Sequence, residues 1–352
     1  MKKRVISILL AMTMTMGLLV GCGSNKSSGS TQSTTGTTKD GAVIAKFSAV
    51  FPATGTQADG ANKLGEFIKE ESTDGIEMEF YPSSQLGDKT AAMEGMISGT
   101  IEMSEFSATD FSNYDDMWSV FSLPYLWDSG LQAVNTLSDP EIMKILEANA
   151  EQYGMMIIAW QNLGSRSIMN SKHTVKTPAD LKGLTVRCMQ DPVLTGTIDA
   201  MGASATPLAW GEVYTAIQQG TIDGCENSTP VLLANGLQET AKYLSLTEQF
   251  IIPDPVVISK KWYDSLSEEN QKAIISAGER YTEWYNNELW PDAEATALEE
   301  LKDAGVEVTE VDKKPFIEAT QGIVNDYLSS ATQEQKDLYE LLIETKDKYA
   351  EQ

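Results

Sequence analysis

The chain has 352 residues, of which 51 are acidic and 26 basic, and its formal charge is −25. Such an anionic protein repels nucleic acid, which is therefore not an expected partner. The three cysteines lack the CxxC spacing of metal and redox sites, so the sequence predicts neither a metal nor a cofactor. About 310 residues follow the N-terminal segments, enough for two lobes of roughly 150 residues each.

The N-terminal segment is predicted to be the leader of a lipoprotein. Residues 1–21 carry three basic residues and then an apolar run, 6–20, that is too short to span a bilayer comfortably. The run ends in Leu-Val-Gly-Cys, which resembles the lipobox of bacterial lipoproteins, in which the cysteine, here Cys22, is diacylated. An ordinary signal peptide with an incidental cysteine is the alternative. Residues 22–41 are rich in Ser, Thr and Gly and are expected to be a flexible tether.

The body alternates between strand-like and helix-like segments. Residues 45–51 and 76–81 are predicted strands, and between them Ala61, Leu64 and Ile68 recur with helical spacing. This alternation predicts an α/β fold with mostly parallel sheets flanked by helices.

One phrase, a helix followed by a glycine and a strand, occurs twice about 120 residues apart, which favours two lobes of similar connectivity. The phrase consists of three apolar helix positions, a glycine that ends the helix and a strand: Met93, Met96, Ile97, Gly99 and 100–106, then Val213, Ala216, Ile217, Gly220 and 221–225. Further along, a long helix is expected to begin at Ser267, to be kinked or broken near Pro291 and to end at Gly305. Four tryptophans within apolar or amphipathic phrases are expected in the core: Trp118, Trp127, Trp262 and Trp290.

The stretch TPADLKGLTVR places an arginine beyond a short strand. Thr177 and Asp180 have the spacing of a helix-capping box, and Gly183 ends the short helix. Residues 184–186 are then a strand with Arg187 at its carboxyl end, where ligands bind in open parallel α/β sheets.

Arg187 has two possible roles on this evidence. It could form a structural ion pair with Asp180, Asp191 or Asp199. However, further polar or aromatic residues follow or end predicted strands and suggest a shared crevice: Arg166, Asn227 and Trp160. A guanidinium can bind a carboxylate at two points, so this group suits a small carboxylate ligand.

Five phrases carry a resemblance to a known family: YPSSQLGD, SLPYLW, GSRSIMNSK, TPADLKGLTVR and MGASATPLAWGEVYTAIQQGTIDGCEN. Together they resemble the DctP-type substrate-binding proteins of tripartite ATP-independent periplasmic (TRAP) transporters. The resemblance implies that Arg187 makes the principal salt bridge to a substrate carboxylate, with Arg166 as a second anion contact. It also implies that Asn227 reaches the same ligand and that Trp210 lines the pocket.

The resemblance further implies a two-lobe, periplasmic-binding-protein-like fold (type II-like), with a long helix spanning both lobes. The expected parts are 42–163 with 253–290 (lobe 1), 164–252 with 291–326 (lobe 2) and a C-terminal helix over 327–352. Hinged lobes close over the ligand, and the closed form delivers it to the small and large TRAP membrane subunits. The implied location is extracytoplasmic, at the cell surface or in the periplasm, and the protein is expected to be a monomer attached to the membrane through lipid at Cys22.

A uronate or similar sugar acid is the favoured ligand, because a C4-dicarboxylate makes less use of a tryptophan. Gln57, with Thr56 and Asp59, is a weaker site candidate, for which helix capping is the alternative. No enzyme is predicted, because the single histidine, His173, lies in a loop and neither GxSxG nor HExxH occurs.

The sequence leaves alternatives open for the function and for the two cysteines of the body. A ligand-sensing surface protein and a carboxylate-pair glycosidase are alternative functions. Cys188 and Cys225 could form a disulfide or be two buried thiols.

Overall fold

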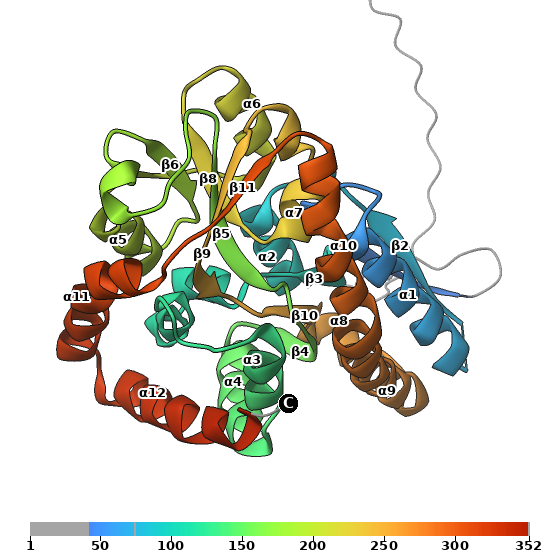
Figure 1. Ribbon diagram of the computed structural model, residues 1–352. Helices are drawn as coiled ribbons and strands as arrows, with labels where there is room; N and C mark the ends of the chain where they lie inside the picture. The colour runs from blue at the N-terminus through green and yellow to red at the C-terminus, as the bar shows by residue number, and fades with distance from the viewer. Residues whose placement is uncertain (1–41, 74, 351–352) are drawn as a thin grey trace, which may run out of the picture. The chain divides into compact units, whose positions relative to one another are not determined.

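The computed structural model describes residues 42–73 and 75–350, which form an α/β fold with two sheets flanked by helices (Figure 1). The first sheet has the order β2 (Ile76–Tyr81), β1 (Val43–Ser48), β3 (Met103–Glu105), β10 (Asp254–Ser259) and β4 (Met155–Gln161). Strands β1, β2 and β3 are parallel, and β10 is antiparallel to both of its neighbours.

The second sheet also contains both parallel and antiparallel strand pairs. Its order is β11 (Glu307–Glu310), β9 (Tyr243–Ile251), β5 (Ser165–Asn170), β8 (Gly224–Asn227), β6 (Thr185–Cys188) and β7 (Ser204–Pro207). Strands β8, β6 and β7 are parallel, whereas β5 is antiparallel to β8 and β9. Each sheet is therefore mixed, with a parallel part in which the carboxyl ends of neighbouring strands lie together.

Helices connect and cover these strands, and several begin at a side chain that accepts a backbone N–H of the first turn, as Asp88, Asp139 and Ser267 do. The helices are α1 (Thr56–Glu71), α2 (Lys89–Ser98), α3 (Gly130–Leu137), α4 (Pro140–Gln152), α5 (Pro192–Ala200), α6 (Val213–Gln218), α7 (Thr229–Ala234), α8 (Lys260–Tyr263), α9 (Glu268–Trp284), α10 (Trp290–Asp303), α11 (Lys314–Ser330) and α12 (Gln333–Lys346). Short 3₁₀ segments lie between them, including Ala108–Asn113, Pro178–Leu181 and Trp210–Glu212.

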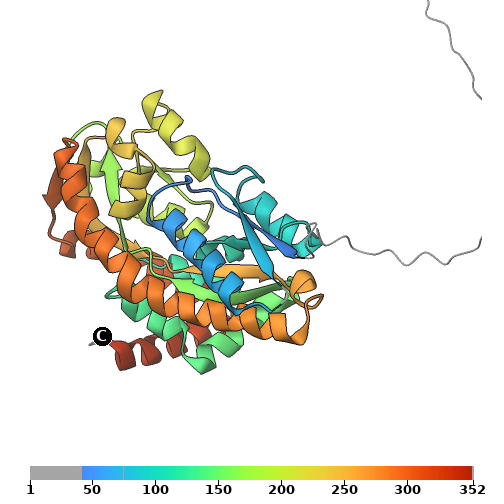
Figure 2. The same cartoon turned by 90° about the vertical axis from the view of Figure 1, so that its right-hand side faces the viewer.

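The predicted long helix is confirmed together with its irregularity. It begins after Ser267, and α9 and α10 continue one another through a single π-helical segment, Tyr285–Leu289 (Figure 2). Pro291 directly follows the π-helical segment, an irregularity of the kind that accompanies a proline inside a helix, and the left-handed Gly305 follows α10. Helix α9 packs on α1 and β4, whereas α10 packs on α7.

The repeated phrase of a helix, a glycine and a strand is confirmed, but both of its strands begin later than predicted. Gly99 and Gly220 both adopt left-handed φ angles, 78° and 71°, at the ends of α2 and α6. Strands β3 and β8 begin three residues later than predicted. The backbone after each glycine first turns back on its helix, with Thr100 N donating to Gly95 O and Thr221 N donating to Ala216 O.

Other boundaries also differ from the predictions. Strand β1 covers Val43–Ser48 rather than 45–51. On α2, Met93 and Met96 are buried but Ile97 is 40% exposed, so the buried face of this helix is narrower than predicted. At the C-terminus, the span 327–352 predicted as one helix contains the end of α11 and the whole of α12, because Ala331 is extended and Thr332 caps a new helix.

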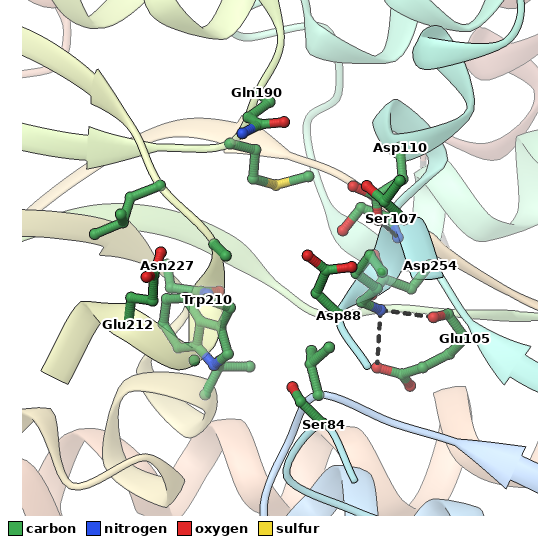
Figure 3. Close-up of a pocket in the computed structure, with 18 of the residues that line it drawn as sticks. Ser84, Asp88, Glu105, Ser107, Asp110, Gln190, Trp210, Glu212, Asn227 and Asp254 are labelled. Atoms are coloured by element: carbon green, nitrogen blue, oxygen red, sulfur yellow. Dashed lines mark hydrogen bonds and ion pairs between the residues drawn. The ribbon is translucent and has the colours of Figure 1, made fainter. Parts of the chain in front are cut away.

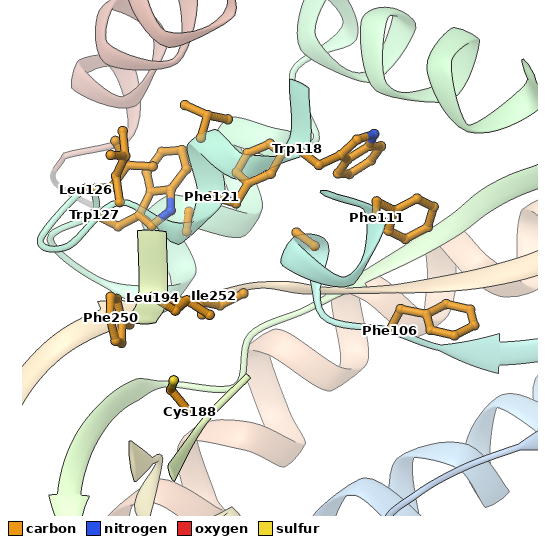
Figure 4. Close-up of a cluster of buried hydrophobic side chains, with 14 of the residues drawn as sticks. Phe106, Phe111, Trp118, Phe121, Leu126, Trp127, Cys188, Leu194, Phe250 and Ile252 are labelled. Atoms are coloured by element: carbon orange, nitrogen blue, oxygen red, sulfur yellow. The ribbon is translucent and has the colours of Figure 1, made fainter. Parts of the chain in front are cut away.

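The largest apolar cluster is rich in aromatic rings (Figure 4). Phe111 and Trp118 stack at its centre with ring centroids 4.4 Å apart. The four tryptophans expected in the core are buried, as predicted: Trp118, Trp127, Trp262 and Trp290. The predicted leader, Cys22 and the tether lie outside the described residues. Within the described part, no helix is both long and apolar enough to cross a membrane.

Candidate ligand-binding site

A cavity of about 760 Å³ is lined by residues from both sheets (Figure 3). This volume lies within the roughly 300–1,000 Å³ typical of small-molecule sites. Glu105, Arg187 and Asn227 reach the cavity from the carboxyl ends of β3, β6 and β8. The first turns of α2 and the 3₁₀ segment Trp210–Glu212 complete opposite sides. The location agrees with the rule that places ligands beyond the carboxyl ends of parallel strands.

Arg187 lies in this cavity although it is only 4% exposed. Its Nε donates to the carbonyl oxygen of Leu208 (2.8 Å), and its guanidinium carbon is 5.2 Å from the centroid of the Trp210 ring. Across the described residues, no carboxylate oxygen lies within 4.0 Å of its guanidinium. Burial lowers the pKa of Arg187, and the neighbouring Arg166 charge acts in the same direction, whereas Glu226 opposes both.

The three acids considered as structural partners of Arg187 have other roles. Asp180 caps the 3₁₀ segment after Thr177, confirming the capping box. Asp191 accepts the first N–H groups of α5, and Asp199 accepts from Ala205 N. The structure therefore does not support a structural ion pair for Arg187 with any of them.

Arg166, in contrast, already has a carboxylate partner. Its Nε and Nη2 donate to the two carboxylate oxygens of Glu226 at 2.5 and 2.9 Å, and both residues are buried. Burial alone would lower the pKa of the Arg166 guanidinium, but the Glu226 carboxylate outweighs it and raises that pKa. Sequence reasoning missed Glu226. Its only signal was its position as an acid directly after the predicted strand 221–225.

Three more predicted residues line the cavity. The indole N–H of Trp210 donates to Asn235 Oδ1 (3.1 Å), which fixes the ring that faces Arg187. Asn227 ends β8, and its Oδ1 accepts from the backbone N–H of Ser228 (2.9 Å). Gln57 lies on the other side, where its Nε2 donates to Glu105 Oε1 (2.8 Å).

Three other candidates are not brought to the cavity. Trp160 is 2% exposed and packs in the largest apolar cluster, and its Nε1 points at the sulfur of Met143. The prediction that Trp160 contacts the ligand is therefore wrong in this structure, because its side chain leaves β4 on the core side. Thr56 and Asp59 lie in the first turn of α1 and are not among the cavity-lining residues. His173 is exposed in its loop, as predicted.

A group of acids that the sequence analysis missed forms part of the cavity wall. Glu105 ends β3, Asp254 begins β10 and Asp110 lies in the 3₁₀ segment Ala108–Asn113. We call these three residues the acidic wall. Lys89 lies beside it, with Nζ donating to the carbonyl oxygen of Glu105 (2.6 Å) and 3.8 Å from Glu105 Oε1. The signal available in the sequence was an acid within each of two apolar runs, MSEF and IIPDPVV.

Burial controls the protonation of the acidic wall. It raises the pKa of Glu105 and of Asp110, and it raises the pKa of Asp254 well above its ordinary value. The nearby Lys89 ammonium opposes this change in all three. Within the described residues, no group of three or more His, Cys, Asp or Glu side chains is arranged to hold a metal ion.

The two cysteines whose pairing was left open are buried free thiols. Cys188 packs in the largest apolar cluster, whereas Cys225 packs in a separate cluster with Met169 and Ile217. Burial raises the pKa of the Cys188 thiol to about 11 and that of the Cys225 thiol to about 12.

The fold and site define a two-sheet solute-binding protein, and comparison with known proteins gives its family. Residues 47–330 match the DctP family, described as bacterial extracellular solute-binding protein, family 7. The chain belongs to this family, the solute receptors of TRAP transporters.

Individual relatives support the assignment. A solute-binding protein of Chromohalobacter salexigens is 34% identical over 288 residues, which cover 81% of this chain and 84% of the relative. The 2,3-diketo-L-gulonate-binding periplasmic protein YiaO of Escherichia coli is 32% identical over 274 residues, covering 78% and 83%. A crystal structure of a TRAP periplasmic solute-binding protein from Chromohalobacter salexigens with bound D-glucuronate has a TM-score of 0.79 and 30% identity, covering 86% of this chain and 99% of that one.

Proposed function

We propose that this TRAP solute receptor captures a sugar acid and that Arg187 binds the carboxylate of the ligand. The observation that carries the proposal is a buried guanidinium that lines a ligand-sized cavity and has no carboxylate partner in the described chain. A buried cation is stabilised strongly only when an anion pairs with it, so a ligand carboxylate supplies the partner that the chain does not provide for Arg187. The names of two relatives, which specify diketogulonate and glucuronate, support the sugar-acid class.

The other cationic and aromatic residues have supporting roles in this proposal. Trp210 lies beside the Arg187 guanidinium and offers a flat apolar surface to a sugar. Arg166 is oriented by Glu226 and supplies a second, weaker attraction for the anion. Asn227 contributes its amide from the end of β8.

Ligand capture is proposed to occur by lobe closure. The lobes are those predicted from the sequence, 42–163 with 253–290 and 164–252 with 291–326. Because Arg187 and Glu105 reach one cavity from different sheets, a ligand that contacts both stabilises the closed arrangement. The closed receptor then docks on the TRAP membrane subunits.

A binding role rather than an enzymatic one is part of the proposal. Neither histidine nor cysteine is among the residues that line the cavity, so its described part lacks these two common nucleophiles and bases. Incubation of the protein with its best sugar-acid ligand, followed by mass spectrometry, should return the ligand unchanged. Any turnover that depends on Glu105 or Asp254 would support a glycosidase-like activity instead.

Membrane attachment is proposed to depend on lipid at Cys22, with a monomeric body outside the cytoplasm. Cys22→Ala protein should then appear in the soluble extracytoplasmic fraction or in the medium, while the wild type stays with the membrane. Membrane association of the variant at the wild-type level would contradict the lipid anchor.

The carboxylate site is tested by isothermal titration with D-glucuronate, D-galacturonate, D-gluconate and D-galactonate. Arg187→Ala should abolish binding of the best ligand, and Arg187→Lys should weaken it by about 1–3 kcal/mol through loss of the two-point geometry. Arg280→Ala is the matched control, because Arg280 is half-exposed and pairs with Glu70 and Glu71 on the surface. Wild-type affinity in Arg187→Ala protein would overturn the proposal.

A further inference from the structure

The two sides of the ligand cavity differ in charge. Arg187 and Trp210 lie on one side together with Glu212, and the acidic wall of Glu105, Asp110 and Asp254 lies on the other. Figure 3 shows the three labelled acids across the cavity from the labelled Trp210. Lys89 is the cation in contact with the acidic wall, and the Arg166 and Arg187 guanidinium groups act on Asp110 from farther away, so three carboxyls face one adjacent ammonium. The cavity therefore treats the two ends of an elongated ligand differently.

Two oxygens of the acidic wall lack the hydrogen bonds that burial demands. Glu105 is 1% and Asp254 is 3% exposed. Within the described protein, neither Glu105 Oε2 nor Asp254 Oδ1 has a hydrogen-bond partner. A buried acceptor without a donor costs free energy, and a ligand that brings a donor recovers it. Sugar hydroxyls are donors, whereas an ionised carboxylate only accepts.

The environment of the acidic wall also opposes additional negative charge. Burial raises the pKa of each of its carboxyls, and Glu105 and Asp110 raise that of Asp254 further. A place that disfavours the ionisation of its own acids is unfavourable for a carboxylate brought by a ligand.

We propose that the acidic wall is the specificity determinant of this receptor, selecting sugar acids with one carboxylate and rejecting the dicarboxylic acids of the same carbon skeleton. The proposal rests on the proposed function, since the one carboxylate is placed at Arg187. The far end of the ligand then carries hydroxyl groups, which donate to Glu105 and Asp254. A second carboxylate at that end would find acceptors and repulsion in place of donors.

The experiment compares ligand pairs that differ at one end. D-Gluconate and D-glucuronate share the diacid D-glucarate, and D-galactonate and D-galacturonate share galactarate. Wild-type protein should bind its best monoacid about 100-fold more tightly than the corresponding diacid, as measured by isothermal titration at constant ionic strength. Glu105→Gln and Asp254→Asn each replace a carboxyl by an amide that cannot carry a negative charge, with little change of shape. In either variant the ratio of the two affinities should fall about tenfold or more, even where monoacid binding itself weakens.

Asp303→Asn is the matched control, because it removes the same charge from the exposed end of α10, outside the cavity lining. Its affinity ratio should equal that of the wild type. Wild-type protein that binds the diacid as tightly as the monoacid would overturn the selectivity proposal, as would an unchanged ratio in both folded variants. Sugar-acid capture by Arg187 would survive either result. If no sugar monoacid binds at all, the proposed function fails and this inference fails with it.

Discussion

Arg166 and Glu226 form a two-point ion pair on the neighbouring strands β5 and β8, and Arg187 lies on the next strand, β6, without a carboxylate partner. Two guanidinium groups thus lie beside one carboxylate, and Arg187 has no carboxylate partner of its own in the described structure. The Glu226 charge also acts on Arg187, whose pKa it raises against the larger effect of burial. This arrangement suits a ligand that brings a carboxylate to Arg187.

The first prediction concerns Glu226→Gln. The substitution keeps the shape of the side chain but leaves Arg166 buried without an anion, beside a second buried guanidinium. We expect the free energy of unfolding of the ligand-free protein to fall by about 3–5 kcal/mol, measured by urea denaturation. The control is Glu77→Gln, which breaks an exposed pair with Lys69 (3.5 Å) and should cost less than about 1 kcal/mol. Equal losses in the two variants would contradict a structural role for the buried pair.

The second prediction concerns Trp210. Of the seven tryptophans, Trp210 is the one that lines the cavity in the described structure. Trp210→Ala should weaken binding by about 1–2 kcal/mol through loss of its contact surface and of its interaction with the Arg187 guanidinium. Trp210→Phe should retain much of the affinity while abolishing the change in tryptophan fluorescence on ligand addition. Trp284→Phe, outside the cavity, should preserve that signal. If the fluorescence change on ligand addition persists in Trp210→Phe protein, another tryptophan reports ligand binding and the prediction is wrong.

The third prediction concerns the two cysteines. Cys188 and Cys225 are buried in different apolar clusters, and their raised pKa values leave few thiolate ions at neutral pH. In a Cys22→Ala background, a thiol reagent should therefore label neither cysteine in folded protein and both in urea. Dithiothreitol should leave the melting temperature unchanged. A melting temperature that drops on reduction would show that the two residues form a disulfide.

The sequence was sufficient to locate Arg187 because local signals determine its position. The capping box at Thr177 and Asp180 sets the direction of the chain, and the following strand directs it to the sheet edge. Such signals depend on neighbouring residues and can be recognised without a fold. The repeated helix and glycine phrase was recognisable for the same reason, although the strand after each glycine begins later.

The acidic wall could not be predicted from the sequence, because its three residues come from segments that are far apart in the chain. Glu105 and Asp254 are adjacent only because β10 returns antiparallel beside β3, pairing Val256 with Glu105. Similarly, the periodicity of β4 could not reveal which face of the strand Trp160 occupies, since nearly the whole strand is buried. Long-range pairing and the choice of face are tertiary properties, so the charged groups that line the cavity were only partly predictable.

The pH dependence of the free energy of unfolding should show that ionisation of Asp254 destabilises the fold, although the same carboxyl is proposed to bind the ligand. Burial raises the pKa of Asp254 well above its ordinary value of about 3.9. The folded protein therefore holds this proton at pH values where the unfolded chain has lost it. Proton binding by the folded state makes the contribution of Asp254 to stability greatest below about pH 4, and the contribution falls as the pH rises toward the folded pKa.

The fourth prediction follows from this sign. Ligand-free Asp254→Asn protein should match the wild type near pH 3.5 and exceed its free energy of unfolding at pH 7. Asp180→Asn is the control of opposite sign, because hydrogen bonds from Lys176 and Thr177 lower the pKa of Asp180. That variant should be less stable than the wild type at pH 7, and the deficit should disappear as the pH falls. A loss of stability in Asp254→Asn at pH 7 would show that the ionised Asp254 carboxylate stabilises the fold through Lys89, and that the acidic wall is a structural element rather than one kept for the ligand.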